Sequence, residues 1–155
     1  MKRGEASVLS SEETRAILRF RVMRVELALF ADQVEEVTEP AEITPIPCAP
    51  PHVPGVVPVR CEALPLFDLA LFLGLSGDGA DGMPRMLIVR SAAYRVGVLC
   101  DQVLGVTAVA AAAIQEARVC GPPSLRRYAL GEVELRGGVT PVLDLEALLA
   151  AGRAQ

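Results

Sequence analysis

The sequence predicts a mainly β protein that is built from two copies of one small unit and carries short helices. Three observations lead to this prediction. An ordered set of motifs occurs twice along the 155-residue chain, apolar and polar residues alternate with the period of strands, and the expected strands are short and regularly spaced, which favours small barrels. With 52% apolar residues, the chain has ample material for a buried core.

The internal repeat is the strongest signal in the sequence. Residues 27–38 align without gaps with residues 96–107, and both segments contain the motif Asp-Gln-Val-x-x-Val-Thr. Residues 59–69 align with residues 135–145 and share an arginine, a proline and an Asp-Leu pair at the same positions. A Cys-x-Pro-Pro motif stands between these blocks in both halves. Three matched blocks in the same order predict two similar halves, divided near residues 76–83.

Strands are predicted from the local patterns. Apolar residues alternate with arginines over residues 18–22 and with charged residues over residues 132–136, which is typical of half-buried strands. Residues 86–89 are apolar throughout and predict a more fully buried strand. Pro65 and Pro141 stand early in apolar runs, so those strands begin there or lie at a sheet edge, where a missing N–H is tolerated.

Each half ends with an aspartate before a short apolar helical pattern. Asp68 and Asp144 are therefore predicted to cap helices. The two aspartates could also be considered as a general acid and base, but the same residue in the same local context favours a structural role. The Gly-x-Gly-x-x-Gly segment at residues 77–82 follows a predicted helix and precedes a strand, so it is interpreted as a linker rather than a dinucleotide site.

Composition excludes several classes of function. The net charge is −4, aromatic residues make up 4% and tryptophan is absent, so a surface that binds phosphate backbones and stacks bases is not expected. Neither a secretory signal nor a membrane-spanning run is recognisable, and we expect a cytosolic protein without direct membrane insertion. The cysteines are interpreted as reduced thiols, and His52 with Cys48 provides too few ligands for zinc; we expect no cofactor and no metal. The cysteines are Cys48, Cys61, Cys100 and Cys120.

The residues alone favour a protein-binding module over an enzyme. No serine or cysteine has a recognisable base with an orienting partner in the sequence. Arg60 and Arg136 recur at the same place in both halves, either as solvated strand ends with structural ion pairs or as interface anchors. The alternative function is a small β-barrel protein that binds a small ligand or an oligonucleotide.

The matched blocks resemble CheW, the adaptor of bacterial chemotaxis, over about residues 15–150. The resemblance implies two roughly five-stranded SH3-like barrels that pack on a shared core. It also implies a layout with a flexible N-terminus at 1–14, a first barrel at about 15–82, a second at about 83–150 and a tail at 151–155. The segments that carry the resemblance are 18–22, 25–29, 34–37, 43–47, 55–57, 59–60, 64–69 and 96–103.

The resemblance further implies a non-catalytic adaptor that couples a chemoreceptor's cytoplasmic tip to a CheA-type histidine kinase. Such a protein is expected to be cytoplasmic, to be recruited to membrane-associated receptor arrays and to be monomeric on its own. We expect Val34 to be an exposed apolar contact for the kinase. The positions matching the kinase-binding surface are Ala31, Val34 and Glu36, and those matching the receptor-binding groove are Arg60, Arg85, Val103 and Val106.

Three departures from the family pattern stand out. The usual glycine turn of the first hairpin is replaced by Met23 and Arg24, the asparagine before the Leu-Arg pair by Pro58, and the glycine after the arginine by Cys61. Because Pro58 and Cys61 flank Arg60, they indicate a divergent copy that serves a specialised pathway.

Overall fold

The computed structural model describes residues 13–40, 42–75, 83–117 and 122–153. Most of the predicted flexible N-terminus, the linker at 77–82 and Cys120 lie outside these ranges. The described elements are β1 (Thr14–Val22), β2 (Val25–Phe30), η1 (Ala31–Gln33), β3 (Val34–Thr38), β4 (Val56–Val59), β5 (Glu62–Phe67), α2 (Leu69–Leu73), β6 (Arg85–Arg90), β7 (Arg95–Cys100), β8 (Gln102–Ala110), η2 (Ala111–Ala113), α3 (Pro123–Arg127), β9 (Ala129–Leu135), β10 (Gly138–Leu143) and α4 (Leu145–Arg153).

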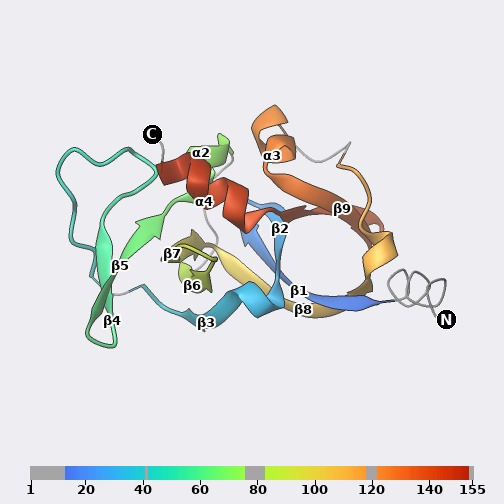
Figure 1. Cartoon of the computed structure of the whole chain (residues 1–155), viewed down its shortest axis with the longest axis horizontal. Coiled ribbons are helices and arrows are strands. Elements are labelled where there is room, and N and C mark those ends of the chain that lie inside the picture. The colour runs from blue at the N-terminus through green and yellow to red at the C-terminus, as the bar shows by residue number, and fades with distance from the viewer. Residues whose placement is uncertain (1–12, 41, 76–82, 118–121, 154–155) are drawn as a thin grey trace.

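The strands within the described ranges form two five-stranded sheets. Sheet A has the order β8-β1-β2-β10-β9, and sheet B has the order β3-β6-β7-β5-β4. Figure 1 shows sheet B on the left and sheet A on the right, with α2 and α4 near the junction between them. The predicted mainly β class, with two small five-stranded units and short helices, is confirmed.

The two sheets do not follow the two halves of the sequence. The hairpin β1–β2 pairs with β8 and β10 of the second half, whereas β6–β7 pairs with β3 and β5 of the first half. If β1 to β5 are matched with β6 to β10 in order, sheets A and B have the same strand order. The predicted boundaries of about 15–82 and 83–150 therefore do not divide the sheets. The repeat identifies which segments are alike, but it does not specify which strands pair. The first hairpin of each half pairs with the later strands of the other half.

The chain crosses between the sheets at the repeated Asp-Gln motif. In the first half, Asp32 lies in η1, between β2 of sheet A and β3 of sheet B. In the second half, Asp101 stands between β7 of sheet B and β8 of sheet A. Its amide donates to the carbonyl of Arg21 at 2.8 Å, and its Oδ2 accepts from the amide of Met23 at 2.6 Å. These two hydrogen bonds connect the β7–β8 crossing to the β1–β2 hairpin.

One glycine beside each sheet allows a close contact with the segment that follows the crossing between the sheets. Thr44 and Val56 form a β-bridge beside sheet B, and Gln115 and Glu132 form the equivalent bridge beside sheet A. A Cβ on Gly55 would lie 2.3 Å from the carbonyl oxygen of Thr44, and a Cβ on Gly131 would lie 2.5 Å from that of Gln115. Only glycine permits this close backbone approach.

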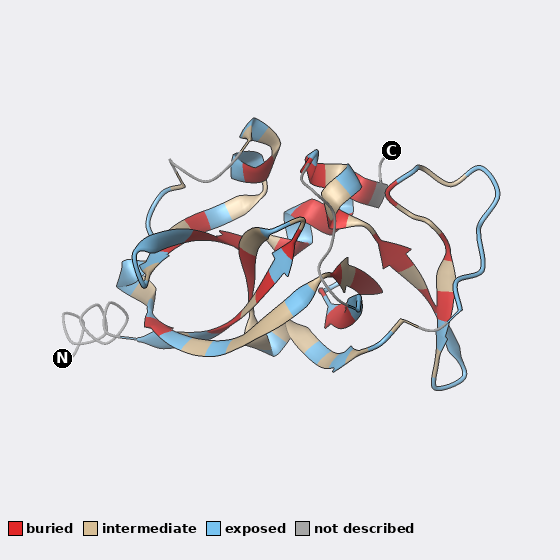
Figure 2. Ribbon diagram, turned by 180° about the vertical axis from the view of Figure 1, so that it is seen from behind, coloured by how far each residue is buried: buried red, intermediate tan, exposed pale blue. Residues whose placement is uncertain are grey.

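A large apolar core joins the two sheets. Phe20 and Leu27 of sheet A meet Leu87 and Val89 of sheet B in one buried cluster, to which α2, α3 and α4 add leucines such as Leu145. In Figure 2, buried segments follow the strands of both sheets and α4. Burial of apolar surface between the sheets holds them together, because each CH₂ group removed from water contributes roughly 0.8 kcal/mol.

The two aspartates are helix caps, as the sequence predicts. A side-chain oxygen of Asp68 accepts from the amide of Leu71 at 3.2 Å, and one of Asp144 accepts from the amide of Ala147 at 3.1 Å. The buried His52 packs near Phe67, and its Nε2 lies 2.9 Å from the carbonyl oxygen of Gly152. These contacts give His52 a structural place at the end of α4.

Candidate protein-binding surfaces

The positions matched to kinase binding lie at the crossing into sheet B. Ala31 begins η1, and Val34 and Glu36 belong to β3, which is an edge strand of the sheet. The prediction that Val34 is an exposed apolar contact is wrong in one respect. Val34 is half-buried, pairs with Val89 and packs against the shared core, so only part of its side chain can meet a partner.

A β-bulge lies at Glu35, next to Val34. Val34 pairs with Val89 and Glu36 with Ile88, so Glu35 is an extra residue in β3. Burial still alternates along β3, with residues 34, 36 and 38 half-buried and residues 35 and 37 exposed. Val37 on the same strand is 41% exposed. Sequence reasoning missed Val37, and no local signal in the sequence marks the bulge.

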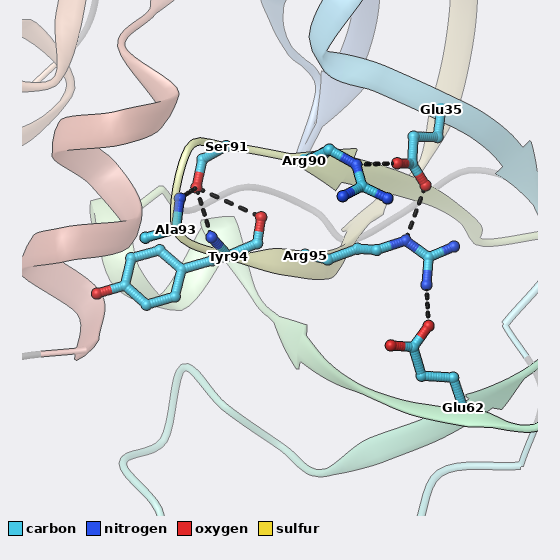
Figure 3. Close-up of polar contacts among 7 residues, drawn as sticks. All are labelled: Glu35, Glu62, Arg90, Ser91, Ala93, Tyr94 and Arg95. Atoms are coloured by element: carbon cyan, nitrogen blue, oxygen red, sulfur yellow. Dashed lines mark hydrogen bonds and ion pairs between the residues drawn. The ribbon is translucent and has the colours of Figure 1, made fainter.

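An ion-pair network crosses the surface of sheet B beside these residues (Figure 3). Arg90 and Arg95 stand directly opposite each other on β6 and β7, where like charges repel. The Glu35 carboxylate contacts Arg90 with one oxygen and accepts from Nε of Arg95 at 2.8 Å with the other. Arg95 also contacts Glu62 on β5. The network therefore ties together strands β3, β6, β7 and β5.

The network shifts the protonation equilibria of its members. Hydrogen bonds from Arg95 and then Arg90 lower the pKa of Glu35, because both arginines stabilise the charged carboxylate. The same contact with Glu35 raises the pKa of Arg95. Sequence analysis does not identify Glu35, since its partners come from two other strands.

The arginines matched to receptor binding both lie on sheet B. Arg60 occupies the two-residue turn between β4 and β5, and its side chain is 70% exposed. Its Nη2 lies 2.6 Å from Oε1 of Glu36. Arg85 begins β6, and its Nη1 lies 3.8 Å from Oε2 of Glu39. The structure therefore brings Arg60 together with Glu36, a residue matched to the other partner.

The two valines matched to receptor binding lie on sheet A. Val106 of β8 is 61% exposed, whereas Val103 is half-buried and packs against the shared core. Arg85 pairs with Cys100 at the end of β7, and β8 begins two residues later. The start of β8 and Arg85 therefore lie at the junction of the sheets.

The substitutions beside Arg60 are compatible with its exposure. Pro58 lies on β4, an edge strand where a missing N–H costs no ladder hydrogen bond. Arg60 and Cys61 both have positive φ, 48° and 69°, as a two-residue hairpin turn of type I′ requires. In the other half, Arg136 and Gly137 form the same kind of turn, with φ of 50° and 82°. The turn thus presents an arginine in both halves.

The described residues contain neither a candidate metal cluster nor a candidate membrane-spanning helix. Within residues 13–40, 42–75, 83–117 and 122–153, no group of three or more His, Cys, Asp or Glu side chains could hold a metal ion. No helix in these ranges is long and apolar enough to cross a membrane.

A cleft of about 260 Å³ beside α4 is mostly apolar, with Phe67, Tyr94 and Leu149 among its lining.

Comparisons with known proteins agree with the architecture. The family model described as "CheW-like domain" matches residues 16–153. A chemotaxis protein CheW from Thermotoga maritima is 37% identical over 90 residues, which cover 58% of this chain and 59% of that protein. The protein FrzA from Myxococcus xanthus is 29% identical over 136 residues, covering 86% of this chain and 84% of FrzA.

The fold also matches that of a solved structure. The crystal structure of the scaffolding protein TtCheW from Thermoanaerobacter tengcongensis superposes with a TM-score of 0.77 at 22% identity, covering 88% of each chain. The CheW family consists of non-catalytic scaffolding proteins, which confirms the prediction that this chain is not an enzyme. The match over residues 16–153 includes strands of both sheets and helices α2, α3 and α4, and the chain belongs to the CheW-like domain family.

Proposed function

We propose that this chain is an adaptor that couples the cytoplasmic tip of a chemoreceptor to a CheA-type histidine kinase. The protein works in the cytoplasm, joins membrane-associated receptor arrays and serves a specialised chemotaxis-like pathway. Membership of the CheW-like domain family supports this proposal. The observation that carries it at the level of the site is Arg60, an exposed guanidinium on a rigid turn, within hydrogen-bond distance of Glu36.

The kinase surface comprises Ala31, Val34 and Glu36. η1 and β3 place these residues at the edge of sheet B, beside the Glu35 network. The network restrains four neighbouring strands, and a rigid surface loses little conformational entropy when a partner binds. A regulatory domain of the kinase would meet apolar area from Val34 next to the charge of Glu36.

The receptor surface comprises Arg60, Arg85, Val103 and Val106. It combines two guanidinium groups of sheet B with the apolar side chain of Val106 on sheet A. Arginine suits such a surface because its planar fork of donors binds carboxylates with two hydrogen bonds. An acidic and apolar helical surface on the receptor tip is the matching chemistry.

Reconstitution from purified components tests the proposal. The chain is mixed with the CheA-type kinase and a receptor signalling fragment from the same organism, and binding to each partner is measured separately. Arg60→Glu should abolish receptor capture while kinase affinity and the thermal unfolding midpoint stay unchanged. Arg127→Glu, a charge reversal at an exposed position of α3, is the matched control. Unchanged receptor capture by Arg60→Glu would exclude the proposed receptor surface, and failure of the wild type to bind a kinase would exclude the adaptor function.

A further inference from the structure

The interior of sheet A contains a cavity that is independent of the proposed adaptor surfaces. Its volume is about 540 Å³. All five strands of the sheet, or the turns at their ends, contribute to its lining, so the cavity opens at the mouth of the curved sheet. The lining residues are Arg19 and Arg21 of β1, Glu26 of β2, Leu104 of β8, Leu135 of β9, Arg136 of the turn and Gly138, Val139 and Thr140 of β10.

Five of the nine residues that line the cavity are polar, whereas Ile17, Ala28, Val109, Val133 and Val142 of the same sheet form a buried apolar cluster. Nη1 of Arg19 lies 3.2 Å from Oε2 of Glu26, and Nε of Arg19 donates to Oγ1 of Thr107 at 3.1 Å. The hydroxyl of Thr140 donates to the same Glu26 oxygen at 2.9 Å. The Arg19 and Glu26 side chains are 18% and 27% exposed, and Thr140 is buried. Desolvating this many polar groups is costly, and a packed apolar interior would avoid the cost.

Sheet B shows that the fold does not require a polar interior. Leu27 and Val96 are equivalent in the repeat and pair with Phe20 and Val89, so Arg19 corresponds to Ile88. Thr140 corresponds to Leu64, one position before the repeated proline. Ile88 and Leu64 pack with Leu66, Met86 and Val57 in a wholly apolar cluster. Sheet A has therefore replaced two filling side chains by polar ones and left an open cavity.

The lining carries an excess of positive charge. Three arginines face one carboxylate, and that carboxylate is already shared by Arg19 and Thr140. The side chain of Arg21 has only the neutral Gln102 as its hydrogen-bond partner among the described residues, at 3.3 Å. The side chain of Arg136 has no hydrogen bond or ion pair within the described part of the chain. An excess of two positive charges at this mouth contrasts with the net charge of −4 of the whole chain.

We propose that the cavity in sheet A binds a small anion that carries a carboxylate or phosphate group, with Arg21 and Arg136 at the mouth as its charged ligands. Small β-barrels bind single small molecules at their mouths. A volume of 540 Å³ suits a metabolite-sized molecule. Arginine forms charge-assisted, two-pronged hydrogen bonds with both groups. Such binding would add a ligand input to the adaptor.

Titration of the isotope-labelled full-length protein with inorganic phosphate and, separately, with citrate tests the proposal. Ionic strength is held constant with sodium chloride. Saturable shifts of the Gly138 and Thr140 amide signals are expected for at least one anion. The double variant Arg21→Ala/Arg136→Ala should raise the dissociation constant about tenfold or more, since hydrogen bonds to charged groups contribute about 1.5–3 kcal/mol. Saturation by phosphate alone or by citrate alone identifies the group that is recognised.

Two further variants separate a built site from general charge attraction. Arg127→Ala removes the same charge from α3, outside the cavity lining, and should bind both anions as the wild type does. Thr140→Leu introduces the residue of sheet B, fills part of the cavity and should abolish the shifts. If Thr140→Leu does not fold, the mouth variants still decide the question. Non-saturating shifts with both anions, or equal weakening by Arg127→Ala, would overturn the proposal.

Discussion

Arg60 and Glu36 form an ion pair, with 2.6 Å between Nη2 and Oε1, that connects the turn after β4 with the edge strand β3. The two residues are 24 positions apart in the sequence and were matched to different partners, Arg60 to the receptor and Glu36 to the kinase. The contact therefore joins a residue of the proposed receptor surface to a residue of the proposed kinase surface. The pair is exposed enough that its own contribution to stability is about 0–1 kcal/mol.

Exchanging the charges of Arg60 and Glu36 tests whether the receptor recognises the Arg60 guanidinium itself or only requires the ion pair. Arg60→Glu should lose receptor binding, because a carboxylate replaces the guanidinium and repels Glu36. The double variant Arg60→Glu/Glu36→Arg restores an opposite-charge pair and should still fail to bind the receptor. Pull-downs with receptor fragments measure this outcome. Recovery of receptor binding in the double variant would show that the receptor does not require a guanidinium at position 60.

Substitutions at two valines of β3 distinguish an effect on kinase binding from an effect on stability. Val34→Asp should weaken kinase binding and also lower the free energy of unfolding by about 1–3 kcal/mol, because the carboxylate would enter an apolar contact with the core. Val37→Asp, at a side chain that is 41% exposed, should leave stability nearly unchanged. If β3 as a whole contacts the kinase, Val37→Asp weakens binding as well.

Calorimetric titration with the kinase measures the affinity of each variant, and thermal unfolding measures its stability. Normal kinase affinity for a folded Val34→Asp protein would contradict the assignment of Val34. Normal affinity for Val37→Asp alone would limit the contact to the beginning of the strand.

The sequence predicts the repeat, the mainly β class and the two caps because these depend on local patterns. Asp68 and Asp144 each precede an apolar helical pattern, and each accepts a hydrogen bond from a residue three positions later. The exchange of hairpins between the halves depends on long-range pairing, which similarity between segments does not specify. The exposure of Val34 was mispredicted because its packing against the shared core is a long-range contact that the local sequence does not specify. The Arg60–Glu36 contact likewise depends on the closure of sheet B.

The Glu35 network should make stability depend on pH in the acidic range. The pKa of Glu35 is lowered in the folded protein from its ordinary value of 4.5, chiefly by Arg95. As the pH falls below 4.5, the unfolded chain takes up the proton first, so this contribution is present above that pH and is lost as the pH falls through the folded-state pKa. Urea midpoints of the wild type should therefore decline more steeply than those of Glu35→Gln. Glu134→Gln, at an exposed position of β9, is the charge-matched control; parallel curves for wild type and Glu35→Gln would refute the prediction.

Substitution of the bridge glycines should destabilise the fold. Gly131→Ala places a Cβ 2.5 Å from the carbonyl oxygen of Gln115, and Gly55→Ala places one 2.3 Å from that of Thr44. Backbone must move in both cases, at a cost of about 1–3 kcal/mol. Gly138→Ala is the control, because its Cβ would lie 3.8 Å from the nearest backbone atom. Denaturant unfolding of the three variants should leave Gly138→Ala close to the wild type; a similar loss in all three would attribute the effect to glycine replacement in general.

Cys61 offers a chemical test of the receptor surface, because it is exposed and adjoins Arg60 in the turn. Burial raises the pKa of the Cys100 thiol to about 12, so this thiol stays protonated and unreactive in the folded protein. In a Cys120→Ser background, a bulky maleimide should label Cys61 and the exposed Cys48 and should label Cys100 only after unfolding. Mass spectrometry identifies the labelled sites.

Labelling should block receptor capture, and Cys61→Ser should protect against this block while Cys48 is still labelled. Blockage that persists in Cys61→Ser would move the receptor contact away from the Arg60 turn.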